Sequence, residues 1–140
     1  MKRIFIDTNI LIDFLARRGE FFIPAWGVVS RSKQGDKILV SALAFATASY
    51  VMENHHKLSQ GTIKTLFDNF IKTCSITPVD SKTIDESIAS EFNDFEDAMQ
   101  YYSALREQAD VIITRNKEDY EAARLPVYEP QEFLDLLTQK

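Results

Sequence analysis

The sequence predicts an α/β protein built on a mostly parallel sheet. Short apolar segments typical of buried strands alternate with longer segments whose apolar residues recur at helical spacing. Capping and turn residues separate these segments, and no linker, repeat or low-complexity stretch interrupts them. The chain has 140 residues. This length predicts one domain over residues 1–140, large enough to bury its own core.

The first strand is predicted over residues 3–6, and it ends at Asp7. Thr8 or Asn9 can cap the helix that follows. Ligands of open parallel sheets bind at the carboxyl ends of the strands, because loops there direct side chains into a crevice. Asp7 is therefore the first candidate site residue. Asp13, further along the helix, is expected to be an ordinary solvated residue.

The middle of the chain continues the alternation of strands and helices. Ser41 follows a short buried strand and can cap a helix that runs to about Glu53. Ser59 and Asp80 are further predicted helix caps. The predicted elements are a helix over residues 21–34, a strand over 37–40, a helix over 42–53, a helix over 61–74, a strand over 75–80 and a helix over 81–89.

Two later segments carry further acidic candidates. A helix that begins at Asn93 or Asp94 has Asp97 in its first turn, and Asp119 follows a late strand. Each aspartate alone fits an ordinary helix-start residue. If the strands are parallel neighbours, these aspartates can converge with Asp7. Carboxylates at one point repel each other unless a cation neutralises them, and oxygen ligands select Mg²⁺ or Mn²⁺.

Polar residues at the end of the late strand are candidates for orienting a ligand. Thr114 and Asn116 can orient a ligand or a metal-bound water. Arg115 can contact a phosphate oxygen or pair with Glu118. The candidate substrate-binding or orienting residues are Asn9, Thr47, Asp94, Thr114, Arg115 and Asn116.

Four segments, in their order and approximate spacing, resemble the PIN domain nucleases. They are FIDTNILID, VSALAFATASYVM, DFEDAMQYYSAL and IITRNKEDY, and the resemblance extends from Lys2 to residue 137. It implies a three-layer α/β/α fold with a central, mostly parallel sheet of four to five short strands. Asp7, Asp97 and Asp119 match the family's catalytic, metal-binding acids. Asn9, Thr114 and Asn116 match its polar companions.

The resemblance also implies an activity and partners. It implies an endoribonuclease that uses Mg²⁺ or Mn²⁺ to activate water and hydrolyse single-stranded RNA. It further implies the toxin of a bacterial toxin–antitoxin pair, a homodimer inhibited by a cognate antitoxin protein.

Thr47 departs from the family pattern. PIN nucleases usually carry a glutamate at this position, and Glu53 lies on a different helix face, so it is a poor substitute. Thr47 is either a plain packing residue or a weak hydroxyl beside the metal. The departure leaves open a non-catalytic PIN module that binds RNA or a protein. An aspartyl-phosphate phosphatase or receiver domain is disfavoured, because Asn9 replaces the acid that such a phosphatase needs.

Composition and charge limit the classes of protein to which the chain can belong. The chain has 16 basic and 21 acidic residues, a net charge of −5, which argues against broad electrostatic coating of nucleic acid. Cys74 is the single cysteine, so no internal disulfide forms. The chain lacks an apolar run of the roughly 18 residues that a membrane span needs, and no signal peptide precedes the first strand. We therefore expect a cytoplasmic protein.

Overall fold

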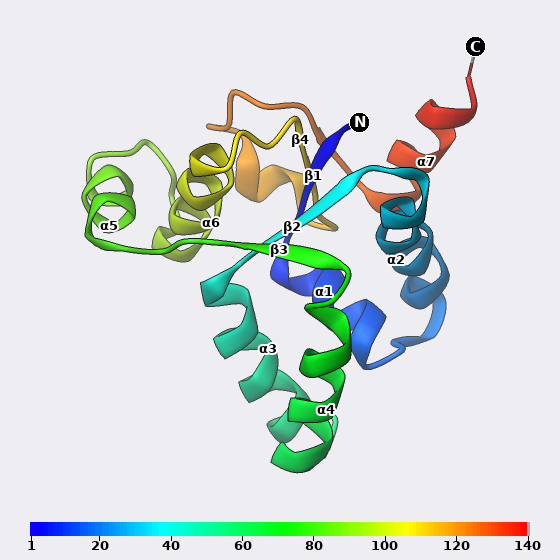
Figure 1. The fold of residues 1–140 in the computed structure, drawn as a ribbon. Helices are drawn as coiled ribbons and strands as arrows, with labels where there is room; N and C mark the ends of the chain where they lie inside the picture. Colours follow the sequence, from blue (N-terminus) through cyan, green and yellow to red (C-terminus); the bar gives the residue numbers. More distant parts are fainter. Residues whose placement is uncertain (140) are drawn as a thin grey trace.

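The computed structural model describes residues 1–139 and contains a five-stranded sheet in the order β3-β2-β1-β4-β5 (Figure 1). All neighbouring strands in the sheet are parallel. The predicted α/β class, with four to five parallel strands, is confirmed. The strands are β1 (Arg3–Ile6), β2 (Lys37–Ser41), β3 (Cys74–Thr77), β4 (Val111–Ile113) and β5 (Val127–Tyr128).

Helices connect the strands and cover both faces of the sheet. Ser41 and Asp94 cap the starts of two of them, as their positions in the sequence predict. The cap of the first helix is Asp7, so the predicted cap at Thr8 or Asn9 is wrong. The helices in the described residues are α1 (Thr8–Leu15), α2 (Phe22–Val29), α3 (Ala42–Asn54), α4 (Gln60–Phe70), α5 (Ser81–Ile88), α6 (Phe95–Arg106) and α7 (Pro130–Thr138), with short 3₁₀ helices at Gly19–Phe21, Ser30–Gln34 and Lys117–Tyr120.

The alternation of side chains along the strands produces two separate cores. Ile4 and Ile6 of β1 face one core, which α1, α2, α3, α4 and α7 complete. Phe5, between them, faces the other core, where Tyr101 and Ala104 of α6 pack against it. A central sheet with helices on each face confirms the expected three-layer α/β/α arrangement.

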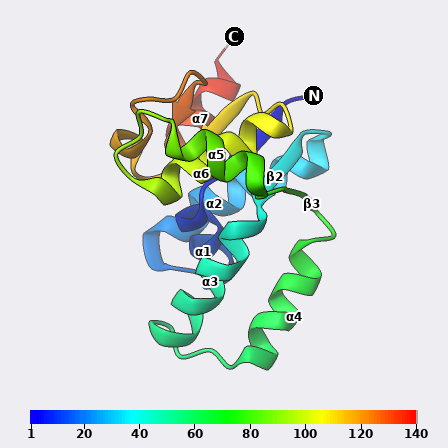
Figure 2. The same cartoon turned by 90° about the vertical axis from the view of Figure 1, so that its left-hand side faces the viewer.

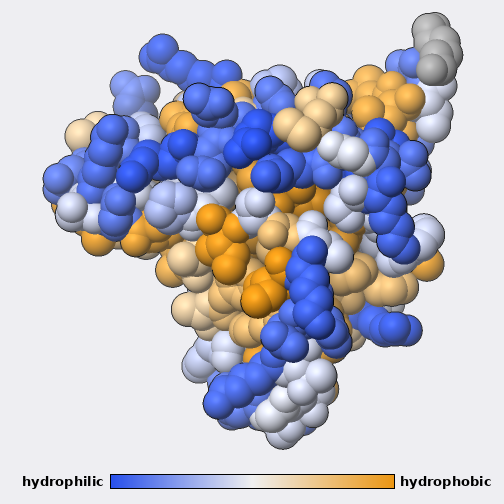
Figure 3. Space-filling model, in the orientation of Figure 1, coloured by the Kyte–Doolittle hydropathy of each residue, from blue (hydrophilic) through white to orange (hydrophobic). Residues whose placement is uncertain are grey.

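Helices α3 and α4 form a pair that projects from the sheet (Figure 2). Phe45 of α3 packs edge-on against Phe67 of α4, with ring centroids 5.0 Å apart. On the face drawn in Figure 3, apolar residues gather beside β3 and between these two helices. The apolar contact between the two helices continues the core on this face of the sheet.

Asp13 of α1 is fully buried, so its expected solvation is wrong. Its Oδ1 accepts a hydrogen bond from Arg18 Nε at 2.7 Å, and its Oδ2 accepts one from Arg115 Nε at 2.7 Å. Arg115 also lies over the ring of Phe21, 3.9 Å from its centroid. Arg115 therefore pairs with Asp13, and of the two alternatives for this residue the pairing with Glu118 is wrong. Sequence spacing missed this because α1 is enclosed on nearly all sides by other elements.

Within residues 1–139, no helix has both the length and the apolar character that crossing a membrane requires.

Candidate functional site

The site lies at the carboxyl edge of the sheet, where three adjacent strands end. Asp7 follows β1, Ser41 is the last residue of β2, and Thr114 follows β4. Strand β1 pairs with both β2 and β4, so these three side chains are neighbours although they lie far apart in the sequence. All three are buried. This edge is the ligand-binding edge of open parallel sheets.

Four donors surround the Asp7 carboxylate. The Thr8 backbone N–H donates to Oδ1 at 2.8 Å, and Thr114 Oγ1 donates to Oδ2 at 2.8 Å. Gln100 Nε2 and Asn9 Nδ2 donate at 3.3 and 3.4 Å. Burial raises the pKa of Asp7, and interactions with Thr114, Thr8, Tyr120 and Gln100 partly offset this. The carboxylate is thus held in one orientation.

Gln100 of α6 forms hydrogen bonds to residues at the ends of β1 and β2. Its Nε2 donates to Thr8 Oγ1 at 2.7 Å, and its Oε1 accepts a hydrogen bond from Ser41 Oγ. Sequence reasoning did not single out Gln100. The available signal was its position three residues after Asp97, which places both side chains on one face of the helix. Gln100 fixes the distance between α6 and Asp7.

Acidic side chains from three elements converge around Asp97, which lies in the first turn of α6. The Asp94 carboxylate caps this helix and accepts a hydrogen bond from the Asp97 backbone N–H at 2.9 Å. Burial and nearby negative charge raise the pKa of Asp97 to about 7. The charges that contribute, largest first, are those of Asp7, Asp94, Asp119 and Glu96.

Asp119 occupies the exposed edge of this group. It belongs to the 3₁₀ helix Lys117–Tyr120. Burial, Glu118 and Asp94 raise the pKa of Asp119. Its charge also acts on Asp97. The structure therefore brings Asp119 into the neighbourhood of Asp94 and Asp97.

Tyr120 places an unpartnered hydroxyl among these acids. The side chain is 2% exposed, and its hydroxyl lies near enough to the Asp7 carboxylate to affect it, although no hydrogen bond of good geometry forms between them. Burial and then the charges of Asp7, Asp97 and Asp119 raise the pKa of Tyr120. A buried hydroxyl without a partner costs free energy. A ligand or a water at this point would supply the missing partner.

The donor chemistry fits a hydrated Mg²⁺ or Mn²⁺ ion. Within residues 1–139, no three His, Cys, Asp or Glu side chains are arranged to hold an ion by themselves. Mg²⁺ does not need such a cage, since it keeps several waters and is commonly held by one or two carboxylates together with a substrate phosphate. Asp7 and Asp97 are the residues that would hold it, with Asp119 at the edge. Carboxylate oxygens and the Tyr120 hydroxyl suit a hard cation.

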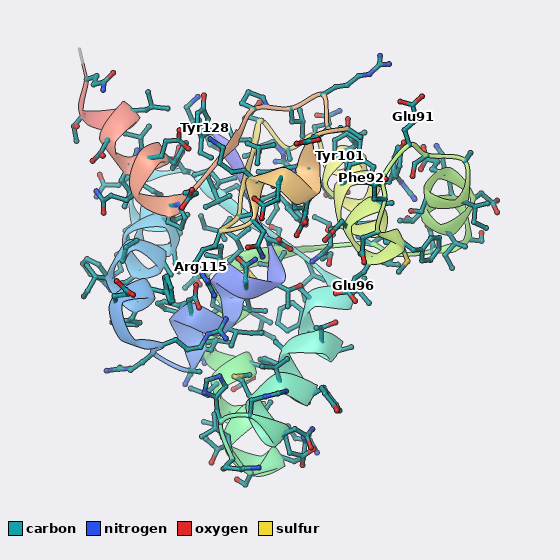
Figure 4. All side chains as sticks on the ribbon, turned by 180° about the vertical axis from the view of Figure 1, so that it is seen from behind. Glu91, Phe92, Glu96, Tyr101, Arg115 and Tyr128 are labelled. Atoms are coloured by element: carbon teal, nitrogen blue, oxygen red, sulfur yellow. The ribbon has the colours of Figure 1, made fainter. Side chains whose placement is uncertain are left out.

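The remaining candidate residues lie around the acidic side chains of the site. Asn9 Nδ2 donates to Thr114 Oγ1 at 3.4 Å, and Thr114 Oγ1 accepts a hydrogen bond from the Asn116 backbone N–H at 3.1 Å. Arg115 lies beside α1, on the side away from Glu96 (Figure 4). Thr47 Oγ1 of α3 donates to Glu96 Oε1 at 3.5 Å. Sequence reasoning missed Glu96, which adjoins Asp97 in the same helical turn.

The raised pKa of Asp97 predicts that stability falls as the pH rises. In the folded chain this carboxyl keeps its proton up to a pH of about 7, above its ordinary pKa of 3.8. Between these values the folded chain binds more protons than the unfolded chain, so the stability that this group contributes at low pH is lost as the pH rises through 7. Metal-free thermal unfolding from pH 5 to 8 measures this effect. Asp97→Asn should flatten the slope, and an unchanged slope in the variant would contradict the assignment.

Comparisons with known proteins show which family and which folds this chain resembles. The family described as PIN domain matches residues 3–118. The solved structure of VapBC2 from Rickettsia felis, bound to a promoter DNA fragment, is similar with a TM-score of 0.64 and 15% identity, over 90% of this chain and 96% of that chain. A toxin–antitoxin complex from Klebsiella pneumoniae is similar with a TM-score of 0.63 and 21% identity, over 90% and 96%.

A third similar structure is VapC20 of Mycobacterium tuberculosis, a toxin that cleaves the sarcin–ricin loop. Its TM-score is 0.63 at 8% identity, over 88% of this chain and 98% of that chain. At such identities the likeness shows the fold. No curated protein sequence matches this chain significantly. The family match spans most of the sequence, and the chain therefore belongs to the PIN domain family, whose members are generally nucleases.

Proposed function

We propose that this protein is a Mg²⁺- or Mn²⁺-dependent endoribonuclease that hydrolyses single-stranded RNA, and that residues 1–140 act as one PIN domain. The observation that carries the proposal is the buried Asp7 carboxylate, held at the end of β1 beside Asp97. Like charges in one buried place are costly unless a cation joins them. The family match supports the same chemistry.

The chain's own residues hold the metal-binding carboxylates in position. When bound, the ion would supply a hydroxide from water and stabilise negative charge on the scissile phosphate. Thr114, Thr8 and Gln100 hold Asp7 by hydrogen bonds, so its oxygens are in place before the ion arrives. Such preorganisation lowers the reorganisation that the reaction requires. Asp97 contributes the second carboxylate from α6.

Arg115 is a candidate contact for the RNA backbone. Its guanidinium is fixed by Asp13 and by the Phe21 ring, and its side chain remains partly exposed, at 26%. A fixed guanidinium binds a phosphate at a lower entropic cost than a free one. Because the chain is acidic overall, we infer that RNA contacts are confined to local positive groups such as this one.

We also propose that the protein is the toxin of a toxin–antitoxin pair and forms a homodimer. One of the similar structures is described as a toxin–antitoxin complex, and another as a toxin. Expression of the chain alone is expected to arrest bacterial growth, and Asp7→Asn should relieve the arrest. Coexpression with a small DNA-binding protein encoded next to the gene should also relieve it. Growth arrest that is equal with the Asp7→Asn variant would contradict a toxic nuclease activity.

Metal removal tests the cofactor requirement. Purified protein treated with a chelator should lose RNA cleavage, and excess Mn²⁺ should restore it, because carboxylates alone do not activate water for attack on a phosphodiester. Cleavage of a labelled single-stranded RNA on a denaturing gel measures this. Full cleavage in the presence of chelator would contradict the proposal.

A non-catalytic PIN module is the second candidate, and Thr47 favours it, because the usual glutamate is absent there. A ligand that binds only the folded state raises thermal stability. A catalytic site should be stabilised by millimolar Mn²⁺, whereas a module that has lost its metal site should show no shift in melting temperature.

A further inference from the structure

We propose that a hollow beside α6 binds one unpaired base of the RNA, stacked against aromatic side chains. The inference rests on the proposed function, since it concerns how the same RNA strand is held. The hollow has a volume of about 320 Å³ and lies between α6, the loop before this helix and the loop that follows the Lys117–Tyr120 helix. Ligand pockets in proteins commonly have such a volume and an apolar, aromatic lining with a few polar groups.

Three aromatic side chains form the apolar wall of the hollow. Phe92 precedes α6, and Tyr101 and Tyr102 belong to this helix. The ring centroids of Tyr101 and Tyr102 are 5.0 Å apart at an interplanar angle of 72°, and those of Phe92 and Tyr101 are 5.1 Å apart. Tyr101 is buried, whereas Phe92 and Tyr102 are half-buried. Figure 4 shows Phe92 beside Tyr101, with Glu91 further out on the loop. Partly open rings of this kind provide faces on which an unpaired base stacks.

Two oppositely charged residues line the hollow without pairing with each other. Within residues 1–139, neither Glu91 nor Arg124 forms an ion pair. The Arg124 backbone N–H donates to the Tyr101 hydroxyl at 3.1 Å, which attaches this loop to the aromatic wall. Burial, Tyr101 and Glu86 raise the pKa of Tyr102. Arg124 opposes this increase and Glu91 adds to it, so both charges lie near the Tyr102 hydroxyl. The free guanidinium can therefore bind a phosphate or a base edge.

The balance of charge around the hollow favours stacking as the source of binding. One basic and one acidic side chain line it, so their formal charges cancel. The whole chain has a net charge of −5 and attracts a polyanion poorly. Aromatic stacking does not depend on net charge, and proteins use it to hold single strands of many sequences. An unpaired base is therefore the part of the RNA that fits this hollow.

The hollow adjoins the acidic site through an aromatic contact. Phe92 packs edge-on against Tyr120, with ring centroids 6.1 Å apart and an interplanar angle of 82°. The Tyr120 hydroxyl in turn lies near the Asp7 carboxylate. Phe92 thus borders the hollow and also contacts a side chain of the acidic site. A strand that is cut at the acids places a nearby nucleotide at the hollow, and a base stacked there fixes which phosphate reaches the acids.

Fluorescence of a base analogue tests the proposal on the metal-free protein, in which the RNA remains uncut. A short single-stranded RNA that contains 2-aminopurine should lose fluorescence when it binds the wild type, because stacking on an aromatic ring quenches this base. Tyr102→Leu should abolish the quenching and weaken RNA binding, measured by fluorescence anisotropy, by about tenfold, as expected for the loss of one stacked base. Tyr102→Phe keeps the ring and should behave as the wild type does.

Two further variants complete the experiment. Tyr50→Leu removes an exposed tyrosine of α3, which is 64% exposed, and is the matched control with wild-type quenching and affinity. Arg124→Gln changes an exposed residue and should weaken binding severalfold without disturbing the core. Unfolding curves establish that each variant is folded. With Mn²⁺ present, Tyr102→Leu should cut a labelled RNA at more positions than the wild type does.

Four outcomes would contradict the inference. Wild-type quenching and affinity in Tyr102→Leu, or equal losses in Tyr50→Leu, would overturn the hollow as an RNA site. Equal quenching of the free 2-aminopurine nucleotide at the same concentration would assign the hollow to a mononucleotide instead of the strand. A wild-type chain that cleaves RNA without quenching the analogue would overturn this inference and leave the proposed function standing. A wild-type chain that neither binds nor cleaves RNA would overturn both.

Discussion

Replacing Asp7 with asparagine is expected to reduce Mn²⁺-dependent RNA cleavage by about a thousandfold. A metal ion contributes several kcal/mol to stabilising the transition state, and each 1.4 kcal/mol corresponds to about a tenfold change in rate. Asp7 is the most constrained acid in the site, with hydrogen bonds of 2.8 Å from Thr8 and Thr114. Its loss therefore removes the carboxylate around which the site is built.

The Asp7→Asn variant should remain folded. Asparagine has the same shape, and its side-chain oxygen can keep the hydrogen bond from the Thr8 backbone N–H. The Asn9 amide can turn its oxygen toward the new amide, which frees the Thr114 hydroxyl to accept from it. Burial raises the pKa of Asp7, which means that its charge costs free energy in the folded chain, so a neutral replacement should leave stability equal or higher. Asp68→Asn, on the exposed side of α4, is the matched control. Equal rates of cleavage by Asp7→Asn and Asp68→Asn would refute the site.

Removing the buried carboxylate of Asp13 is expected to cost stability, with Asp13→Ala lowering the free energy of unfolding by about 3 kcal/mol. Asp13 is 0% exposed and binds Arg18 and Arg115 at 2.7 Å each. The variant leaves two guanidinium groups without their shared partner. The cost falls at the lower end of the range for buried pairs because both arginine side chains retain 26% exposure.

Denaturant unfolding with and without the substitution measures this loss, and a melting temperature lower by about 10 °C is expected. Asp85→Ala, on the exposed surface of α5, should change stability by no more than about 0.5 kcal/mol. An Asp13→Ala variant as stable as the Asp85→Ala control would show that the two ion pairs contribute nothing net. The variant should also weaken RNA binding if Arg115 contacts a phosphate.

Local sequence patterns predicted the elements that carry the site. Residues 3–6 form β1 and residues 37–40 lie in β2, as their apolar runs indicate. Asp80 and Asp94 cap helices through their side chains, as expected from their positions before helical segments. Strand patterns and helix caps depend on interactions between residues that are only a few positions apart in the sequence. The same patterns also located Asp7 at the end of a strand, which is where the sheet presents ligands.

The contacts of each site residue were harder to predict from the sequence than the strands and helices were. Gln100 contacts Thr8, from which it is separated by 92 residues, and Arg115 contacts Asp13 across 102 residues. Tyr120 was not singled out, because its role depends on which charges surround a buried hydroxyl. Glu96 was overlooked for a similar reason, since its neighbour on α3 is known only once α3 and α6 have been placed.

The sequence by itself determined the α/β class, the starts of several helices and the choice of Asp7, Asp97 and Asp119 as candidate site residues. It did so because strand and helix periodicity and capping are local properties of the chain. Only the tertiary structure decided that Asp13 is buried between two arginines, that Gln100 positions Asp7, and that Glu96 lies against Thr47. The physical reason is that burial, charge and hydrogen bonding at these positions come from elements about a hundred residues away, and packing alone brings them together.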